Sequence, residues 1–114
     1  MAQGLRFAIP IANGKLCSHF GHCESFAIID TVDGTITDIN FLTPPPHEPG
    51  VLPRWLKSLG VDIVIAGGMG VRAQSLLQQM GIEVIVGAPE EDPRILVDQY
   101  LKSCLRVGEN PCHH

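Results

Sequence analysis

The chain has 114 residues, of which 45% are hydrophobic and 18% charged, and its formal net charge is −4 at pH 7. This length supports one domain with a single core, so two independently folded domains are excluded. The acidic balance argues against a nucleic-acid partner, and no apolar run approaches the ~20 residues of a membrane-spanning helix.

The N-terminus and the cysteines predict the compartment. Residues 1–6 do not show the charged and then apolar arrangement of a secretory signal, and strand-like sequence begins at once. We therefore expect a cytoplasmic protein. Four cysteines in a reducing cytoplasm indicate metal or redox chemistry before a disulfide framework.

The N-terminal part of the chain predicts an antiparallel meander of three strands. Asn13-Gly14 marks the turn after the first strand, and Asp33-Gly34 predicts a tight hairpin turn because both residues tolerate positive φ angles. Pro10 is expected to interrupt the pairing of the first strand, since it has no N–H to donate. The three predicted strands cover residues 5–12, 25–31 and 35–41.

The second half of the chain alternates helices with buried strands. Asp92 and Pro93 are the expected N-cap and first residue of the last helix. The middle helix has an expected apolar set of Val71, Leu76, Leu77 and Met80. The predicted helices cover residues 52–59, 71–80 and 93–105, and two further strands cover residues 61–66 and 82–86. The first of these strands is continuously β-branched or apolar after its start, which is typical of a strand covered on both faces.

This order of elements predicts an α/β fold in which a mixed five-stranded sheet carries helices on both faces. Residues 1–106 are expected to form the single domain, followed by a polar C-terminal tail at 107–114. The proline-rich stretch at 43–50 is predicted to be a stiff surface connection within that domain.

Metal-ligand residues are concentrated in one short loop at residues 17–23, which contains Cys17, His19, His22 and Cys23. Thiolate and neutral imidazole suit zinc, copper and iron–sulfur centres. The spacing is not that of a zinc finger, whose second pair of ligands lies far along the chain. Two alternatives remain open. The cysteines could form a disulfide, or the loop could be structural, with Phe20 in the core and Gly21 at the bend.

A second candidate element is a glycine-rich turn between a buried strand and a helix, made of Gly67, Gly68, Met69 and Gly70. Glycines let a backbone approach a ligand closely, and the first N–H groups of a helix attract an anion. Arg72 could add a donor. The same glycines could also serve the turn geometry alone.

Three other places carry ligand-type residues. His47, in the proline-rich connection, is expected to be solvated, and Cys104 is expected in the core on the apolar side of the last helix. The C-terminal residues Cys112, His113 and His114 could be an extra ligand arm or a terminus without a role.

Two motifs resemble those of a known family. A β-rich opening is followed by His19-Phe20-Gly21, and a Val-Asp-Ile-Val-Ile strand is followed by the glycine turn and a helix ending in Gly81-Ile82-Glu83-Val84. In this order, over residues 5–105, the chain resembles the nitrogenase iron–molybdenum-cofactor-binding domain family.

The resemblance implies a three-layer ribonuclease H-like fold. It also implies binding of a cofactor or metal–sulfur cluster, as in small stand-alone members such as the orange protein. The residues that it implicates are His19, Phe20 and Gly21, with the turn at 67–70 facing them. Cys17, His22 and Cys23 lie outside the shared pattern, so their roles rest on ligand chemistry alone.

The predicted function is therefore non-catalytic binding or carriage of a metal–sulfur cluster of the Mo/Cu or Fe/Mo type, or of its precursor. Such a cluster is anionic, and an ATPase or a metalloprotein is an expected partner. The alternatives are a simple zinc or transition-metal site and a protein-interaction module without bound metal. A nuclease would need several carboxylates on the central strands, and residues 5–12 contain none, so no enzymatic activity is predicted.

Overall fold

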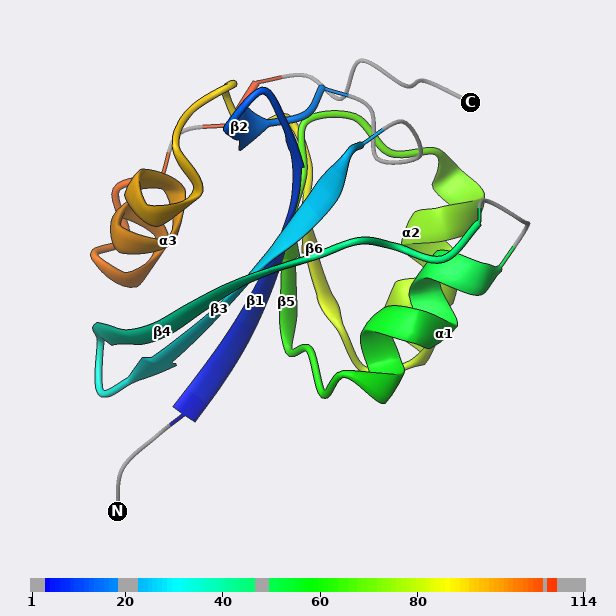
Figure 1. Cartoon of the computed structure of the whole chain (residues 1–114), viewed down its shortest axis with the longest axis horizontal. Coiled ribbons are helices and arrows are strands. Elements are labelled where there is room, and N and C mark those ends of the chain that lie inside the picture. Colours follow the sequence, from blue (N-terminus) through cyan, green and yellow to red (C-terminus); the bar gives the residue numbers. More distant parts are fainter. Residues whose placement is uncertain (1–3, 19–22, 47–49, 106, 109–114) are drawn as a thin grey trace.

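Among the residues that the structure describes, six strands form one mixed sheet, and three helices cover its two faces (Figure 1). The computed structural model describes residues 4–18, 23–46, 50–105 and 107–108. The strands are β1 (Gly4–Ala12), β2 (Lys15–Leu16), β3 (Ser25–Val32), β4 (Thr35–Leu42), β5 (Ile63–Ile65) and β6 (Glu83–Ile85). The helices are α1 (Val51–Ser58), α2 (Val71–Gln79) and α3 (Pro93–Leu101). None of these helices is long and apolar enough to cross a membrane.

The strand order across the sheet is β4-β3-β1-β5-β6, with β2 paired to the end of β1. β1, β3 and β4 pair antiparallel, whereas β5 lies parallel to β1 and β6 parallel to β5. The predicted α/β class and the antiparallel opening are confirmed. The sequence prediction of five strands missed β2, whose two residues are too few to show a periodic pattern.

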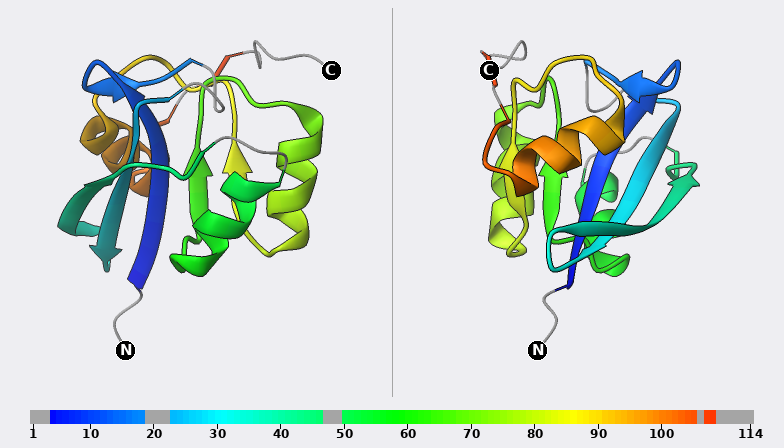
Figure 2. Two further views of the ribbon diagram at one scale, coloured as in Figure 1. Left: turned by 45° about the vertical axis from the view of Figure 1, so that its right-hand side comes forward. Right: turned by 90° about the vertical axis from the view of Figure 1, so that its left-hand side faces the viewer.

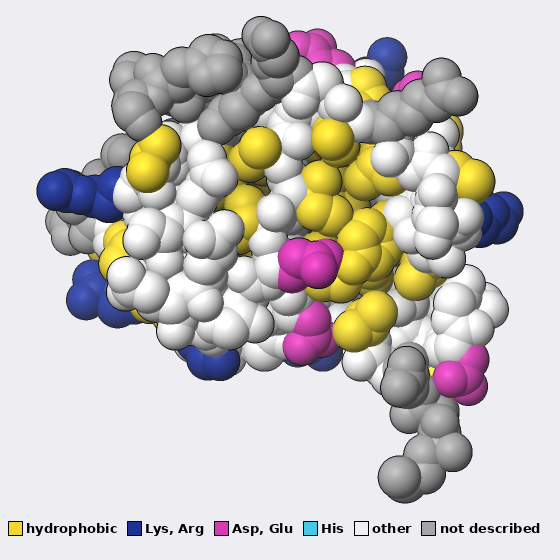
Figure 3. Space-filling view, turned by 180° about the vertical axis from the view of Figure 1, so that it is seen from behind, with side chains coloured by type: hydrophobic (Ala, Val, Ile, Leu, Met, Phe, Trp, Pro, Cys, Tyr) yellow, Lys and Arg dark blue, Asp and Glu magenta, His cyan; other side chains and the backbone are white. Residues whose placement is uncertain are grey.

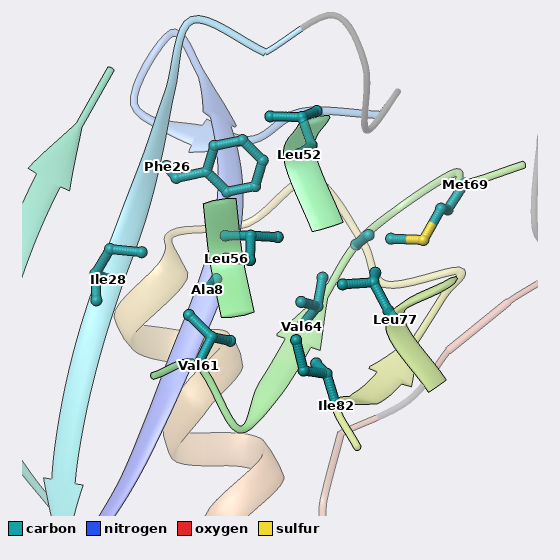
Figure 4. Close-up of a cluster of buried hydrophobic side chains, with 11 residues drawn as sticks. Ala8, Phe26, Ile28, Leu52, Leu56, Val61, Val64, Met69, Leu77 and Ile82 are labelled. Carbon is teal, nitrogen blue, oxygen red and sulfur yellow. The ribbon is translucent and has the colours of Figure 1, made fainter. Parts of the chain in front are cut away.

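Two hydrophobic clusters hold the layers together, one on each face of the sheet. α1 and α2 cover one face and α3 covers the other (Figure 2). Successive side chains of β1 point to opposite faces of the sheet, so this strand contributes to both clusters. Ala8 belongs to the first cluster, and Phe7 and Ile9 belong to the second. The first cluster, shown in Figure 4, joins Phe26 of β3 to helix residues such as Leu77. Strand β5 is buried on both faces, as predicted.

The predicted turns are confirmed by their backbone angles. Asn13 and Asp33 have φ values of 56° and 51°, and the glycine after each also has a positive φ. Pro10 does not interrupt β1, because its register with Phe26 is kept. Its carbonyl accepts a hydrogen bond from Cys17 N. The backbone N and O of a strand residue point to the same side of the strand. The nitrogen of Pro10 therefore faces away from β3, and its missing N–H removes no hydrogen bond between β1 and β3.

The helices are predicted in the right places, but two burial predictions are wrong. Val71 is 54% exposed, because the stripe that packs on the sheet consists of Ala73, Leu77 and Met80, and position 71 points away from it. Cys104 is exposed because α3 ends at Leu101, four residues earlier than expected. The N-cap prediction is confirmed, since the Asp92 carboxylate accepts a hydrogen bond from Arg94 N.

Candidate functional site

Strand β1 fixes both ends of the cysteine-bearing loop. Cys17 N donates to Pro10 O at 2.8 Å, and Glu24 N donates to Ile11 O at 2.9 Å. The Glu24 carboxylate also accepts a hydrogen bond of 2.7 Å from Asn13 N. The two ends of the loop therefore lie on either side of the end of β1, with Cys17 beside Pro10 and Glu24 beside Ile11.

The two thiols of this loop lie at the edge of the core. Cys17 is 9% exposed, and Cys23 is half-buried against the cluster beneath α1 and α2. Both are thiols, so the alternative of a disulfide between them is not realised. Burial, and to a smaller extent the neighbouring Cys17, together raise the pKa of Cys23 to about 11. At neutral pH Cys23 is therefore a protonated thiol, and a metal that binds it has to displace its proton.

The glycine turn lies directly against this loop. A methyl group added to Gly67 would stand 3.1 Å from Ser18 Cα and 3.1 Å from Leu16 Cδ2. Only a residue without a side chain leaves both groups in place. Among the described residues, the cysteine loop thus lies next to the turn after β5, as predicted, through the contact between Ser18 and Gly67.

The residues of the glycine turn and of the first turn of α2 differ in how far they are buried. Met69 is 1% exposed and its side chain lies in the core beside Leu77 (Figure 4), and its carbonyl accepts a hydrogen bond of 3.0 Å from Gln74 Nε2. Gly70 is the N-cap of α2 and has open space around its Cα. Among the described residues, no side chain caps this helix, and its first turn contains no acidic residue. Arg72 is exposed there. This end of α2 therefore presents positive potential beside the cysteine loop.

Several predicted site residues lie outside the described residues, namely His19, Phe20, Gly21, His22, His47, Cys112, His113 and His114. Within the part of the chain that is described, no group of three or more His, Cys, Asp or Glu side chains could hold a metal ion. Cys17 and Cys23 thus contribute two donors that need others to complete a metal site.

Comparison with known proteins identifies the family of the chain. A family profile described as "Dinitrogenase iron-molybdenum cofactor" matches residues 4–103, nearly the whole chain. The chain belongs to this family. An uncharacterized protein of Methanocaldococcus jannaschii is 32% identical over 85 residues, which are 70% of this chain and 72% of that protein.

Two solved structures share the fold of this chain. The crystal structure of PH0822 has a TM-score of 0.84 at 25% identity, covering 90% of this chain and 94% of that one. The apo form of the orange protein from Desulfovibrio gigas has a TM-score of 0.73 at 22% identity, with coverages of 93% and 94%. The predicted resemblance and the predicted fold class are therefore confirmed.

Two hollows of this family member lie away from the cysteine loop. One, of about 550 Å³, is lined by Ile85 of β6, by the end of α3 and by Val107. The other, of about 400 Å³, surrounds Arg6, whose guanidinium pairs with Asp30 at 2.7 Å. The view from behind in Figure 3 also shows hydrophobic side chains gathered near the centre of that face, beside acidic groups. Neither hollow combines soft metal donors with positive potential, so the loop and the glycine turn remain the better candidate.

Sequence reasoning missed two residues that shape the site. Glu24 closes the loop through Asn13, and Gly87 donates a hydrogen bond of 2.6 Å from its N–H to Gly67 O. A signal for Gly87 was present, because it follows strand β6 as Gly67 follows β5. The sequence around Glu24 gives no signal of this role, because its hydrogen-bond partner, Asn13, lies on the other side of the loop.

Proposed function

We propose that this family member binds a metal–sulfur cluster or its precursor as cargo and does not transform it. The observation that carries the proposal is the contact of Gly67 with Ser18, which joins the thiol-bearing loop to the N-terminal end of α2. Family membership and the fold shared with the orange protein support the same kind of cargo.

The residues of the candidate site have ligand groups and charges that suit such a cluster. The thiols of Cys17 and Cys23 can become thiolates for a copper, iron or molybdenum centre. Clusters of this kind are anionic, and the N-terminal end of α2 with Arg72 offsets negative charge. His19 and His22 would add imidazole nitrogens from the same loop.

The absence of a catalytic role is part of the proposal. The described donor side chains of the site are the thiols of Cys17 and Cys23, which are ligand groups and not a carboxylate pair for acid–base work. We further propose that the carrier works in the cytoplasm, where its thiols stay reduced, and that it passes its cargo to an ATPase or a metalloprotein.

The test is reconstitution with tetrathiomolybdate and copper, or with iron and sulfide, followed by desalting, visible spectroscopy and elemental analysis. We expect a coloured species that stays with the protein and is lost in Cys17→Ser and Cys23→Ser. The exposed Cys104→Ser is the matched control and should retain the colour. A colourless, metal-free protein after desalting would disprove the proposal, and bound zinc without sulfide would replace it with a simple zinc site.

A further inference from the structure

Basic side chains gather on the two helices that cover one face of the sheet. Residues 50–61 and 63–82, which include α1 and α2, contain Arg54, Lys57 and Arg72, whereas all twelve acidic residues of the chain lie outside these stretches. All three cations are exposed, and they define what we call the basic face. In Figure 3, Lys and Arg side chains project at the left edge, which is the side of α1 and α2 in Figure 1. This face is basic although the net charge of the chain is −4.

The cations of the basic face are not neutralised by carboxylates within the described part of the chain. No described carboxylate pairs with Arg54 or Arg72. Lys57 donates a hydrogen bond of 2.8 Å to a backbone carbonyl, that of Met80. The positive charge of these side chains is therefore available to a partner.

The acidic residues that follow the two helices in the chain are engaged elsewhere. After α1, the Asp62 carboxylate accepts a hydrogen bond of 2.8 Å from Arg6 N of β1. After α2, the Glu83 carboxylate accepts one of 2.6 Å from the hydroxyl of Tyr100 in α3, which covers the opposite face of the sheet. Neither carboxylate is directed at the basic face by these bonds.

Both helices begin at the end of the sheet that carries the cysteine loop. α1 leads into β5 and α2 into β6, and these strands are parallel to each other and to β1. The N-terminal ends of both helices therefore lie where β1 ends, beside the loop that starts at Cys17. Neither first turn contains an acidic residue, so the two helix dipoles add to the positive potential there. A molecule on the basic face would lie next to the candidate site.

Apolar side chains accompany the cations. Val71 is 54% exposed beside Arg72, and Trp55, next to Arg54, is partly exposed. The cores of protein–protein interfaces are enriched in aromatic side chains and arginine. Binding to a nucleic-acid backbone typically uses about six to ten cations and binding to an anionic membrane about four to eight, more than this face has. The composition of the face therefore favours a protein.

We propose that the basic face docks a protein whose surface presents carboxylates around an apolar side chain, which would cover Val71. Charge complementarity carries this choice, because cations without carboxylate partners attract an acidic surface and repel a basic one. The same attraction steers the partner to the end of the sheet where cargo would enter or leave. The docking rests on α1 and α2 and does not depend on the identity of the cargo.

Titration of the isotope-labelled full chain with two peptides tests the proposal by nuclear magnetic resonance. One peptide repeats two glutamates and a leucine, and the other has lysine in place of glutamate. The ionic strength is about 0.15 M, at which exposed charges more than about 8 Å apart are screened. With the glutamate peptide we expect amide shifts in α1 and α2 that diminish as salt is added, and with the lysine peptide we expect none.

Two double variants of equal net charge serve as test and matched control. Arg54→Gln with Lys57→Gln removes two cations of the basic face. Arg94→Gln with Lys102→Gln removes two cations of the opposite side that already pair with carboxylates. The first double variant should raise the Kd for the glutamate peptide about fivefold or more, and the second by less than about twofold. Val71→Ser should also weaken binding, because it removes the exposed apolar contact.

Several outcomes would overturn the proposal. They are no binding of the glutamate peptide, shifts centred on other elements, and equal weakening in the two double variants. Tighter binding of a DNA duplex or of phosphatidylserine vesicles at the same ionic strength would assign the face to a nucleic acid or to a membrane instead. Shifts in α1 and α2 that grow with protein concentration alone would assign it to a second copy of this chain.

Cluster retention separates this proposal from the proposed function. After reconstitution with tetrathiomolybdate and copper, Arg54→Gln with Lys57→Gln should retain as much cluster as the parent protein, because neither residue belongs to the candidate site. If the parent protein retains no cluster but still binds the glutamate peptide through α1 and α2, the proposed function fails and the docking face stands. Cluster retention without binding of the peptide would give the reverse result.

Discussion

Ser18 lies against Gly67 so closely that a methyl group at position 67 would stand 3.3 Å from Ser18 O as well as 3.1 Å from its Cα. This contact joins the loop after β2 to the turn between β5 and α2, two segments far apart in the sequence. It makes position 67 the most direct place to disturb the candidate site without removing a ligand.

Gly67→Ala should therefore loosen the loop and weaken cargo binding. The added methyl group meets Leu16 and the Ser18 backbone, and such overpacking costs about 1–3 kcal/mol. We expect a lower free energy of unfolding in urea and reduced cluster retention. Gly4→Ala is the control, because position 4 lies at the start of β1 and a methyl group there would make an ordinary contact of 3.7 Å with Thr31 O. Equal retention in both variants would show that the contact does not shape the site.

Gly70→Asp should change stability and binding in opposite directions. Aspartate caps α2 and complements its dipole, which stabilises the fold by about 0.5 kcal/mol. The same negative charge opposes an anionic cluster, so retention after desalting should fall. Gly70→Asn caps without charge and separates the two effects. Retention that is the same for aspartate and asparagine would argue that the cargo carries no negative charge at this helix end.

The thiol of Cys23 should react slowly with iodoacetamide at neutral pH, because burial holds its pKa at about 11. We expect its labelling rate to rise about tenfold per pH unit up to that value, since only the thiolate reacts. The exposed Cys104 is the internal comparison in peptide mapping. Rapid labelling of Cys23 at pH 7 would contradict the burial seen here.

The same shift predicts how stability depends on pH. The folded pKa of Cys23 is raised above that of the unfolded chain, about 8.5. Its contribution to stability is therefore complete below that pH and is lost as the pH rises through about 11. Cys23→Ala should have a flatter stability profile over this window than the parent protein, measured by urea unfolding.

Tyr100 provides a spectroscopic test of the packing of α3 on the sheet. Its hydroxyl donates to the Glu83 carboxylate at 2.6 Å, and this hydrogen bond, with burial, raises its pKa to about 12. Because it is the only tyrosine, absorbance near 295 nm reports its titration alone. Glu83→Ala should move the midpoint down towards 10. An unchanged midpoint would mean that α3 and β6 are not joined through this pair.

Some features could be predicted from the sequence because they depend on neighbouring residues. Asp33-Gly34 forms its turn through its own backbone angles, and Asp92 caps the helix that starts one residue later. The ligand residues of the loop could also be recognised, since their chemistry does not depend on the fold. Burial at Val71 was mispredicted, because the orientation of a helix on its sheet decides which stripe is covered.

The amino-acid sequence by itself determined the α/β class, the order of the helices and of the strands other than β2, and the donor-type residues, because periodicity, turn residues and side-chain chemistry are local properties. Only the tertiary structure decided that Gly67 meets Ser18 and that Gly87 holds Gly108. It also decided that the side chain of Met69 belongs to the core. These relationships follow from the order of strands across the sheet, which brings distant segments together, and the same local patterns are compatible with other orders.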